Sequence, residues 1–322
     1  MTIWKRKRVG LALGGGGVRG FSHIGVLKAL EQEAITIDLI AGTSAGALIG
    51  GAYAGGLSPR EIQRRVETYL HSPAFKNSSL HSLGSALQPR KRSLREEASL
   101  YLRNRYLMIR SFFRPALLPI EDFQSLVEYF IADIAIEDTR IPFIPVSTDL
   151  ITGEKIVFTR GSLRKAVLAS CAVPGAVEPI KQGEWLLADG GITSLVPVHT
   201  VKQAGVDVVI AVVVSRGIQT SALFSTAQDV FQRAGEIAAD KLEAIELKDA
   251  DVIIRPDVGD LHWMDFSRAR ELIRAGEVAA RSSLPKIRQF LPLPYRLRQL
   301  AKGFSLFRRK IAGVEKSDPP ND

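Results

Sequence analysis

The sequence predicts an α/β fold in which helices cover both faces of one mainly parallel sheet. Two observations support this fold class. Short apolar runs alternate with longer segments of helical periodicity from residue 8 to residue 282, which is the order of β-α-β units. The run at residues 207–214 is apolar throughout after its first residue, as in a strand that is buried on both faces.

The first half of this pattern begins with a short apolar strand at residues 8–13, which ends at a run of glycines. A helix follows at residues 18–32, because its apolar residues recur at helical spacing. The next strand, at residues 37–41, leads into a helix at residues 45–53. A further helix begins at Ser58, with proline in its first turn. A glycine-rich turn therefore follows each of the first two strands.

The alternation resumes after residue 119. We expect helices at residues 121–132, 162–172, 222–250 and 265–282, and strands at residues 142–148, 155–159, 184–188, 207–214 and 251–255. The long helix at residues 222–250 carries an apolar stripe of the kind that packs on a core. The stripe consists of Ala227, Val230, Phe231, Ala234, Ile237, Ala238 and Ile245.

Three short motifs carry the functional information. A glycine loop occupies residues 14–20, where glycine lets backbone N–H groups approach an anion closely. The Gly-x-Ser-x-Gly sequence of residues 42–46 places Ser44 on a tight strand-to-helix turn. Asp-Gly-Gly at residues 189–191 places a carboxylate on a loop. Together they supply an anion-binding loop, a nucleophile and a base, which suffice to cleave an ester.

In this order and context, the motifs resemble those of the patatin-like phospholipase family. The resemblance extends from about residue 9 to about residue 214 and includes the segments at residues 20–27, 147–154 and 169–175. Members of that family have a three-layer α/β/α fold and use a Ser-Asp dyad without histidine. The sequence departs from the family at residues 192–197, where many members carry an asparagine before the proline. This departure concerns a supporting contact rather than the dyad.

The resemblance implies a lipid acyl hydrolase of the phospholipase A or lysophospholipase type. Ser44 is then the nucleophile, Asp189 its base, and the backbone of the glycine loop the oxyanion hole. The reaction passes through an acyl-serine intermediate, which water hydrolyses. The oxyanion residues are Gly15, Gly16 and Gly17, and the supporting motif residues are Arg19, Gly20, Gly42, Gly46, Gly190 and Gly191. Arg19 either orients the loop or contacts a head-group phosphate.

The expected substrate is a lipid ester, and no cofactor is expected. No cluster of His, Cys, Asp and Glu has metal-ligand spacing, so no metal is expected either. The sequence contains five histidines. His199 follows the Asp-Gly-Gly loop and could complete a triad, but a surface or structural role accounts for it. His23 is expected to pack or hydrogen-bond beside the glycine loop.

Composition and charge bear on compartment and partners. The chain has 322 residues, a formal net charge of +9 and one cysteine, Cys171, so an intramolecular disulfide is impossible. The apolar run before the glycines is too short for a signal peptide, and no run has the length of a transmembrane helix. We expect a cytoplasmic protein, with peripheral attachment to the inner face of the membrane as an alternative. The sequence leaves the oligomeric state open.

The net positive charge favours anionic partners. The positions of the basic residues favour lipid, and no nucleic-acid-binding motif is present. Residues 8–284 form the expected catalytic domain, with the core motifs within residues 9–214, and residues 285–322 form a basic amphipathic tail. Within the tail, residues 295–311 predict a helix whose narrow apolar arc lies opposite a basic face, as on an anionic membrane. A loosely docked terminal helix with a solvated basic side is the alternative.

Residues 71–119 have the composition of an insertion. Its second half predicts a helix at residues 99–114 with arginines on one face and aromatic residues on another. Such a helix is either a lid or lipid contact over the active site, or an ordinary helix whose arginines are solvated.

Two other functions compete with ester hydrolysis. The glycine loop, with Asp38 eighteen residues after Gly20, fits a Rossmann dinucleotide site tolerably. Against this, Asp38 begins its strand rather than ending it, and a ribose site needs no serine elbow. The other alternative is a catalytically idle scaffold that docks on a membrane.

Overall fold

The computed structural model describes residues 6–86, 116, 118–220 and 224–291. It contains one eight-stranded sheet. The strands are β1 (Val9–Leu13), β2 (Leu39–Thr43), β3 (Phe143–Asp149), β4 (Lys155–Val157), β5 (Ile180–Gln182), β6 (Trp185–Asp189), β7 (Val208–Val212) and β8 (Val252–Ile254). The α-helices are α1 (Ser22–Gln32), α2 (Ala45–Ala54), α3 (Pro59–His71), α4 (Pro73–Lys76), α5 (Ser79–Ala86), α7 (Ile120–Phe130), α8 (Leu163–Ser170), α9 (Val198–Gln203), α10 (Ala227–Glu246) and α11 (Ala269–Phe290).

The sheet is mostly parallel, which confirms the predicted fold class. Its strands follow the order β5-β6-β3-β2-β1-β7-β8, and β4 pairs with β3 off this path. The five strands from β3 to β8 in this order are parallel, whereas β4, β5 and β6 form an antiparallel edge region. All parallel strands therefore end at one edge, where the glycine loop and the serine turn both lie.

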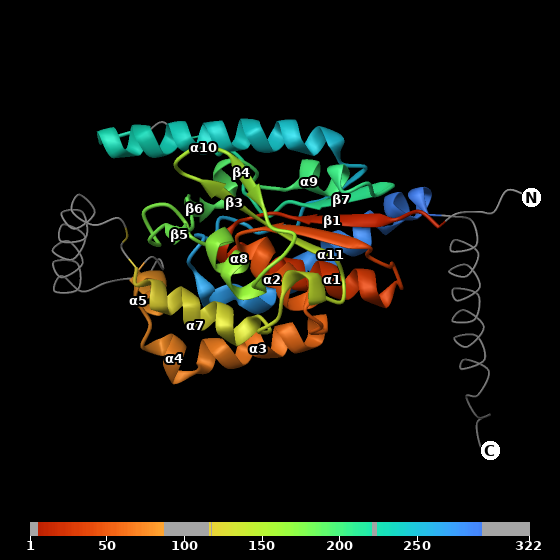
Figure 1. The fold of residues 1–322 in the computed structure, drawn as a ribbon, viewed down its shortest axis with the longest axis horizontal. Helices are drawn as coiled ribbons and strands as arrows, with labels where there is room; N and C mark the ends of the chain where they lie inside the picture. Colours follow the sequence, from red (N-terminus) through yellow and green to blue (C-terminus); the bar gives the residue numbers. More distant parts are fainter. Residues whose placement is uncertain (1–5, 87–115, 117, 221–223, 292–322) are drawn as a thin grey trace, which may run out of the picture.

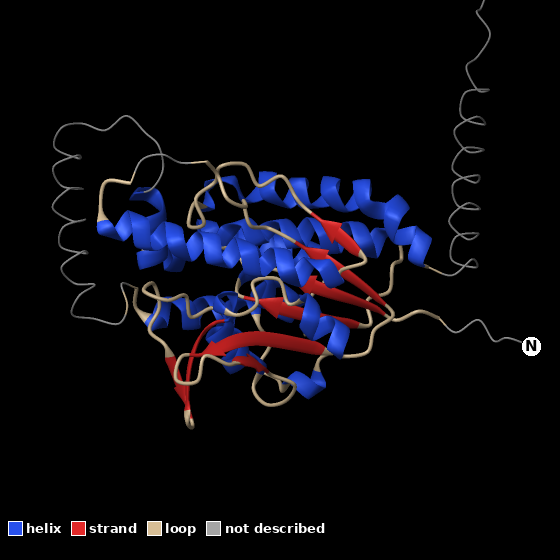
Figure 2. Ribbon diagram, turned by 90° about the horizontal axis from the view of Figure 1, so that it is seen from above, coloured by secondary structure: helices blue, strands red, loops and turns tan. Residues whose placement is uncertain are grey.

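Helices cover the two faces of the sheet unequally (Figures 1 and 2). The central strand β1 turns Leu11 and Leu13 toward a large core that α1, α2, α8 and α11 complete. Between them, Ala12 faces a smaller core that includes Val198 and Val201 of α9. This alternation follows from the two-residue period of a strand. Because both faces are covered, β1 is buried along its whole length.

Helix α3 begins as predicted. Ser58 forms a capping box with Glu61, in which each side chain bonds the backbone N–H of the other residue, and Pro59 occupies the first turn. Helix α11, in contrast, runs beyond the predicted end at residue 282 and continues through Pro285 to Phe290. Leu284 and Ile287 pack in the large core, so tertiary burial outweighs the helix-breaking tendency of the proline.

Helix α10 lies where expected, but the prediction that its apolar stripe packs on the core is wrong. The largest members of the stripe face solvent: Phe231 is 82% exposed and Ile245 57%. The residues of α10 that are buried are acidic, Glu243 and Glu246. In Figure 1 the helix lies along the outer side of the molecule, above β3 and β4. It attaches to the body mainly through its C-terminal half, because the buried residues lie there.

The predicted helices at residues 99–114 and 295–311 lie outside the described residues. Within the part of the chain that the structure describes, no helix is both long enough and apolar enough to cross a membrane.

Candidate active site

Ser44 occupies a sharp turn between β2 and α2, as the motif predicts. Its backbone has a φ of 55° and a ψ of −123°, which is a strained conformation for a residue other than glycine and costs about 1–3 kcal/mol. The Ser44 N–H donates to Oγ of Ser170 at 2.9 Å, and Ser170 Oγ donates to the carbonyl of Val146 at 2.5 Å. A buried hydroxyl from α8 therefore connects the strained turn to β3.

Close backbone packing explains the glycines around this turn. A Cβ at Gly46 would lie 2.1 Å from the carbonyl oxygen of Leu13, so only glycine lets α2 approach the end of β1. The other motif glycines that are packed as tightly, with a neighbouring atom at 2.3–2.5 Å from such a Cβ, are Gly17, Gly20, Gly42 and Gly190. At Gly191 the nearest atom is an oxygen of Asp189, at 3.1 Å.

Asp189 ends β6 and reaches Ser44 across the sheet edge. Its backbone pairs with Ser147 of β3, and its Oδ1 accepts the N–H of Gly191 at 2.7 Å. The side chain of Ser44 lies close enough to this carboxylate to affect its pKa. Burial raises the pKa of Asp189 to about 6, although the Ser44 side chain and the Gly191 N–H oppose that change. The structure thus brings the serine and the aspartate of two distant motifs into contact.

The glycine loop passes directly beside the serine. A Cβ at Gly15 would lie 3.2 Å from Cβ of Ser44. The N–H of Gly15 donates to the carbonyl of Leu195 at 2.9 Å, so this donor is already occupied. Among the described residues, no acceptor is recorded for the N–H groups of Gly16 and Gly17. Of the three glycines expected to form the oxyanion hole, Gly16 and Gly17 are therefore the candidate donors.

Two side chains hold the loop in place. Arg19 donates from Nε to the carbonyl of Gly16 at 3.1 Å, which matches the first of its two predicted roles, orientation of the loop. Burial, together with the charge of Arg216, lowers the pKa of Arg19 to about 10. His23 is fully buried, and its Nε2 contacts the carbonyl of Gly14 at 2.8 Å. Burial lowers the pKa of His23 to about 4, so this ring is neutral at physiological pH.

A further polar chain supports the site from α10, and the sequence motifs did not reveal it. Thr43 Oγ1 donates to the carbonyl of Ser194 at 2.8 Å, and Ser194 Oγ donates to Oε1 of Glu246 at 2.6 Å. The same loop supplies the Leu195 carbonyl that binds Gly15. This loop is the segment at residues 192–197 that departs from the family pattern. Glu246 lies outside every motif, so only the folded structure places it here.

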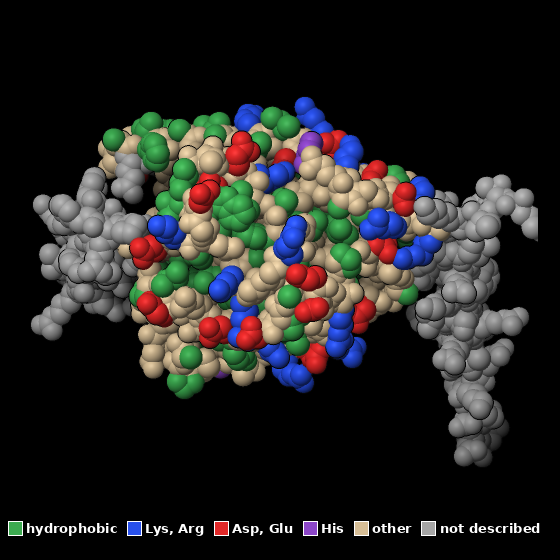
Figure 3. All heavy atoms as spheres, viewed as in Figure 1, with side chains coloured by type: hydrophobic (Ala, Val, Ile, Leu, Met, Phe, Trp, Pro, Cys, Tyr) green, Lys and Arg blue, Asp and Glu red, His purple; other side chains and the backbone are tan. Residues whose placement is uncertain are grey.

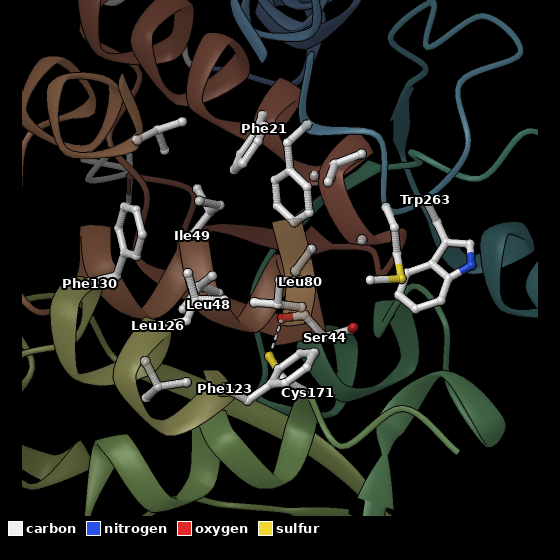
Figure 4. Close-up of a pocket in the computed structure, with 18 of the residues that line it drawn as sticks. Phe21, Ser44, Leu48, Ile49, Leu80, Phe123, Leu126, Phe130, Cys171 and Trp263 are labelled. Atoms are coloured by element: carbon white, nitrogen blue, oxygen red, sulfur yellow. Dashed lines mark hydrogen bonds between the residues drawn. The ribbon is translucent and has the colours of Figure 1, made fainter. Parts of the chain in front are cut away.

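An apolar pocket opens next to Ser44 and encloses about 860 Å³ of empty space, part of it open to solvent. Figure 4 shows Ser44 between Phe130 on one side and Trp263 on the other. Helices α2, α3, α5 and α7 contribute most of the lining, which is nearly all hydrocarbon. Leu80 of α5 is part of it, so the described beginning of the predicted insertion at residues 71–119 contributes one residue to the lining.

Cys171 lies beside Ser44 but is not a second nucleophile. Its thiol is buried and donates to the Ser44 carbonyl at 3.4 Å (Figure 4). Burial, with a smaller effect from the charge of Asp189, raises the pKa of this thiol far above its usual value. The thiol is therefore protonated and behaves as a small packing group.

Two other polar residues near the Asp-Gly-Gly loop contact structural partners. His199 Nδ1 lies 3.1 Å from Oδ2 of Asp249 at the surface. Asp149 accepts bonds from the backbone of Thr152 and Leu186 and so fixes a turn. Within the described ranges, no group of three or more His, Cys, Asp or Glu side chains could hold a metal ion.

The position of Asp38 argues against a dinucleotide site. Its Oδ2 accepts the N–H of Val9 at 2.8 Å, and Val9 is the first residue of β1. The glycine loop follows the last residue of the same strand. Asp38 therefore lies at the opposite end of β1 from the loop, whereas a ribose-binding carboxylate must lie near the loop.

Comparison with known protein families agrees with this geometry. A sequence model described as patatin-like phospholipase matches residues 11–202. This chain belongs to the patatin-like phospholipase family. The match covers all three motifs, the α8 serine and most of the loop that follows Asp189, so the patatin-like part includes both members of the predicted dyad.

Several relatives of this patatin-like chain are longer than it is. An uncharacterized NTE family protein of Mycobacterium tuberculosis is 34% identical over 205 residues, which cover 64% of this chain and 48% of the relative. The mouse patatin-like phospholipase domain-containing protein 6 is 33% identical over 207 residues, which cover 63% of this chain and 13% of that protein. The chain thus spans about half the length of the mycobacterial relative.

Among solved structures, VipD from Legionella pneumophila is similar to this chain. The TM-score is 0.43 with 15% sequence identity, and the match covers 87% of this chain and 67% of that chain. At this level of similarity, the details of the site come from this chain's own residues.

Proposed function

We propose that this protein is a serine lipid acyl hydrolase that cleaves carboxylic esters with a Ser44–Asp189 dyad. The observation that carries the proposal is the proximity of these two side chains at the wall of an apolar pocket. A strained nucleophile, a buried carboxylate and a hydrocarbon-lined cavity occur together at one place. Membership of the patatin-like phospholipase family supports the same reaction class.

In the proposed mechanism, Asp189 takes the proton of Ser44 as the serine oxygen attacks the ester carbonyl. The N–H groups of Gly16 and Gly17 stabilise the resulting oxyanion, and the loss of one such donor typically costs about 3 kcal/mol of transition-state stabilisation. As the intermediate collapses, Asp189 returns the serine proton to the departing oxygen, so that the alcohol or lysolipid leaves, the acyl group stays on Ser44 and the carboxylate is restored. Asp189 then activates water, which releases the fatty acid and restores the serine.

The pocket supports an acyl chain as the part of the substrate that it binds. A site that removes hydrocarbon from water gains about 0.8 kcal/mol for each buried CH₂ group. The lining around Phe123, Leu126 and Phe130 offers no charged partner for a head group. We therefore place the acyl chain in this pocket and the alcohol part of the ester toward solvent.

Active-site labelling tests the proposal. A fluorophosphonate should modify Ser44 covalently, because the dyad makes this serine nucleophilic while the other serines remain unactivated. Mass spectrometry of the labelled peptide identifies the site. In a dinucleotide-binding protein or an idle scaffold, Ser44 would not react, so an unmodified Ser44 would refute the proposed hydrolase activity. Preincubation with a long-chain ester should slow the labelling more than preincubation with its free alcohol.

We also propose that residues 295–311 attach the protein to an anionic membrane. The sequence of this segment places Leu297, Leu300 and Phe304 on one side of a helix and basic residues such as Arg298 opposite them. Such a helix gains from apolar burial and from attraction to anionic lipid. The helix at residues 99–114 is the alternative attachment site. No nucleic-acid partner is proposed.

Removal of the tail should reduce membrane affinity without reducing catalysis. The shortened chain should end after Leu291, because Ile287 and Leu291 are buried in the core and an earlier end would damage α11. We expect it to bind anionic vesicles much less than the full chain and to hydrolyse soluble short-chain esters at a similar rate. Binding of the full chain should weaken as salt rises. If the full and shortened chains bound equally in vesicle flotation, the attachment site would lie outside the removed tail.

A further inference from the structure

Helix α10 has its polar and apolar sides reversed relative to an ordinary surface helix. Its inner side carries Glu243 and Glu246, which are 4% and 6% exposed and accept hydrogen bonds from Ser215 and Ser194. Its outer side carries Phe231, which is 82% exposed. Hydrophobic side chains line this helix in the space-filling view (Figure 3). A helix that buries two carboxylates and exposes large hydrocarbon side chains is suited to meet a further apolar surface.

The exposed residues form a regular seam along the helix. At 100° per residue, they fall within an arc of about 140°, and Lys241 is the one charged residue in that arc. Within the set, residues 227, 230, 234, 237, 241 and 244 are spaced alternately by three and four residues, which is the heptad pattern of paired helices. We call this set the α10 seam: Ala227, Val230, Phe231, Ala234, Ile237, Ala238, Lys241, Ala244 and Ile245.

We propose that the α10 seam binds the same seam of a second copy of this chain, with the two helices antiparallel. The seam is complementary to itself in that orientation. A two-fold axis near residue 236 places Ala234 opposite Ala238 of the other copy, so the backbones can approach closely at the centre. The same axis places Ala227 opposite Ile245, a small residue against a large one.

The position of Lys241 in the seam fits the same antiparallel arrangement. About the same axis, Phe231 lies opposite Lys241 of the other copy, where the alkyl part of the lysine covers the ring and the ammonium group can lie over its face. A single lysine in an otherwise apolar seam also fixes the register of a helix pair. A parallel pair would instead place the two lysines against each other.

The composition of α10 favours a second copy over a lipid surface. Helices that lie on anionic membranes are rich in lysine and arginine on their polar side. Helix α10 has five acidic residues against two basic ones, namely Asp229, Glu236, Asp240, Glu243 and Glu246 against Arg233 and Lys241. Its alanines add little hydrocarbon for insertion into lipid, but they permit close helix packing.

Matched substitutions test the proposal. Val230 in the seam and Val278 on α11 are both 56% exposed, so an aspartate at either site should be tolerated by the fold. The full chain should sediment as a dimer. Val230→Asp should raise the dissociation constant of this dimer by at least about 100-fold, which corresponds to about 2.7 kcal/mol. Val278→Asp should leave the dissociation constant unchanged. Circular dichroism and thermal unfolding confirm that each variant is folded.

Two outcomes would overturn the proposal. One is a full chain that stays monomeric over about a hundredfold range of concentration, up to the highest attainable. The other is an equal loss of dimer in Val278→Asp. If the full chain is monomeric and Val230→Asp lowers its flotation with vesicles, the seam binds lipid instead of a second copy. These measurements do not depend on hydrolysis, so they succeed or fail separately from the proposed activity.

Cross-linking tests the orientation. The native Cys171 is buried, so a cysteine added to the seam would be the reactive one. A mixture of Ala234→Cys and Ala238→Cys chains should form disulfide-linked dimers that contain one chain of each kind. A parallel pair would instead link each variant mainly to itself. That second pattern would refute the antiparallel arrangement.

Discussion

Replacing Ser44 with alanine is expected to abolish ester hydrolysis in a protein that remains folded. The serine supplies the atom that forms the acyl intermediate, so loss of the hydroxyl removes the reaction path itself rather than one stabilising contact. By analogy with other serine hydrolases, kcat should fall at least about 10⁴-fold. The rate of p-nitrophenyl ester cleavage measures the loss, and thermal unfolding shows that the fold persists.

Two companion variants distinguish the chemical role of Ser44 from its backbone role. Ser225 is exposed and belongs to none of the three motifs, so Ser225→Ala should retain activity. Ser44→Gly should be inactive but more stable than Ser44→Ala, because glycine relieves the positive φ of this position. Substantial turnover by a folded Ser44→Ala chain would remove this residue from the mechanism.

Replacing Asp189 with asparagine is expected to cost nearly as much activity as the loss of Ser44, because the two residues act as a unit. An amide cannot take the serine proton. In the unaltered protein, kcat/KM should rise with pH around a midpoint near 6, since burial raises the pKa of Asp189 to about 6 and only the carboxylate acts as a base. If His199→Ala were as inactive as Asp189→Asn with its fold intact, a triad would replace the dyad.

The same pKa predicts an opposite effect on stability. A carboxyl group whose pKa is raised on folding stabilises the fold at pH values below its unfolded pKa, and this contribution is lost as the pH rises through 6. A change of about two in pKa corresponds to about 3 kcal/mol. The melting temperature of Asp189→Asn should therefore increase relative to the parent between pH 4 and pH 8, because the amide carries no charge to bury. A pH-independent difference would contradict the raised pKa.

The features that were predictable from sequence are those that local rules determine. The glycines around Ser44 predict a turn that only close backbone packing allows, and Gly46 against Leu13 shows that packing. The order of strands and helices predicts a mainly parallel sheet, whose parallel strands end at one edge, where Ser44 lies. Asp189 reaches that edge through the antiparallel strand β6, whose pairing with β3 sets Asp189 opposite Ser147.

The features that were not predictable depend on contacts between distant elements. The apolar stripe of α10 has the right period for core packing, but periodicity cannot tell which side of a helix faces the body. The N–H of Gly15 is occupied by Leu195, a partner that no motif rule supplies. Similarly, Pro285 marks a helix end in isolation, whereas burial of Ile287 carries α11 past it.

The hydrogen bond between Ser194 and Glu246 makes α10 a candidate allosteric element. Both side chains are buried, and a buried carboxylate that loses its partner costs about 1–3 kcal/mol. The helix therefore cannot shift without disturbing the loop whose Leu195 carbonyl holds Gly15 beside the nucleophile. By linkage, if a partner on the outer side of α10 changes the affinity of the active site for its ligand, that ligand must change the binding of the partner by the same factor.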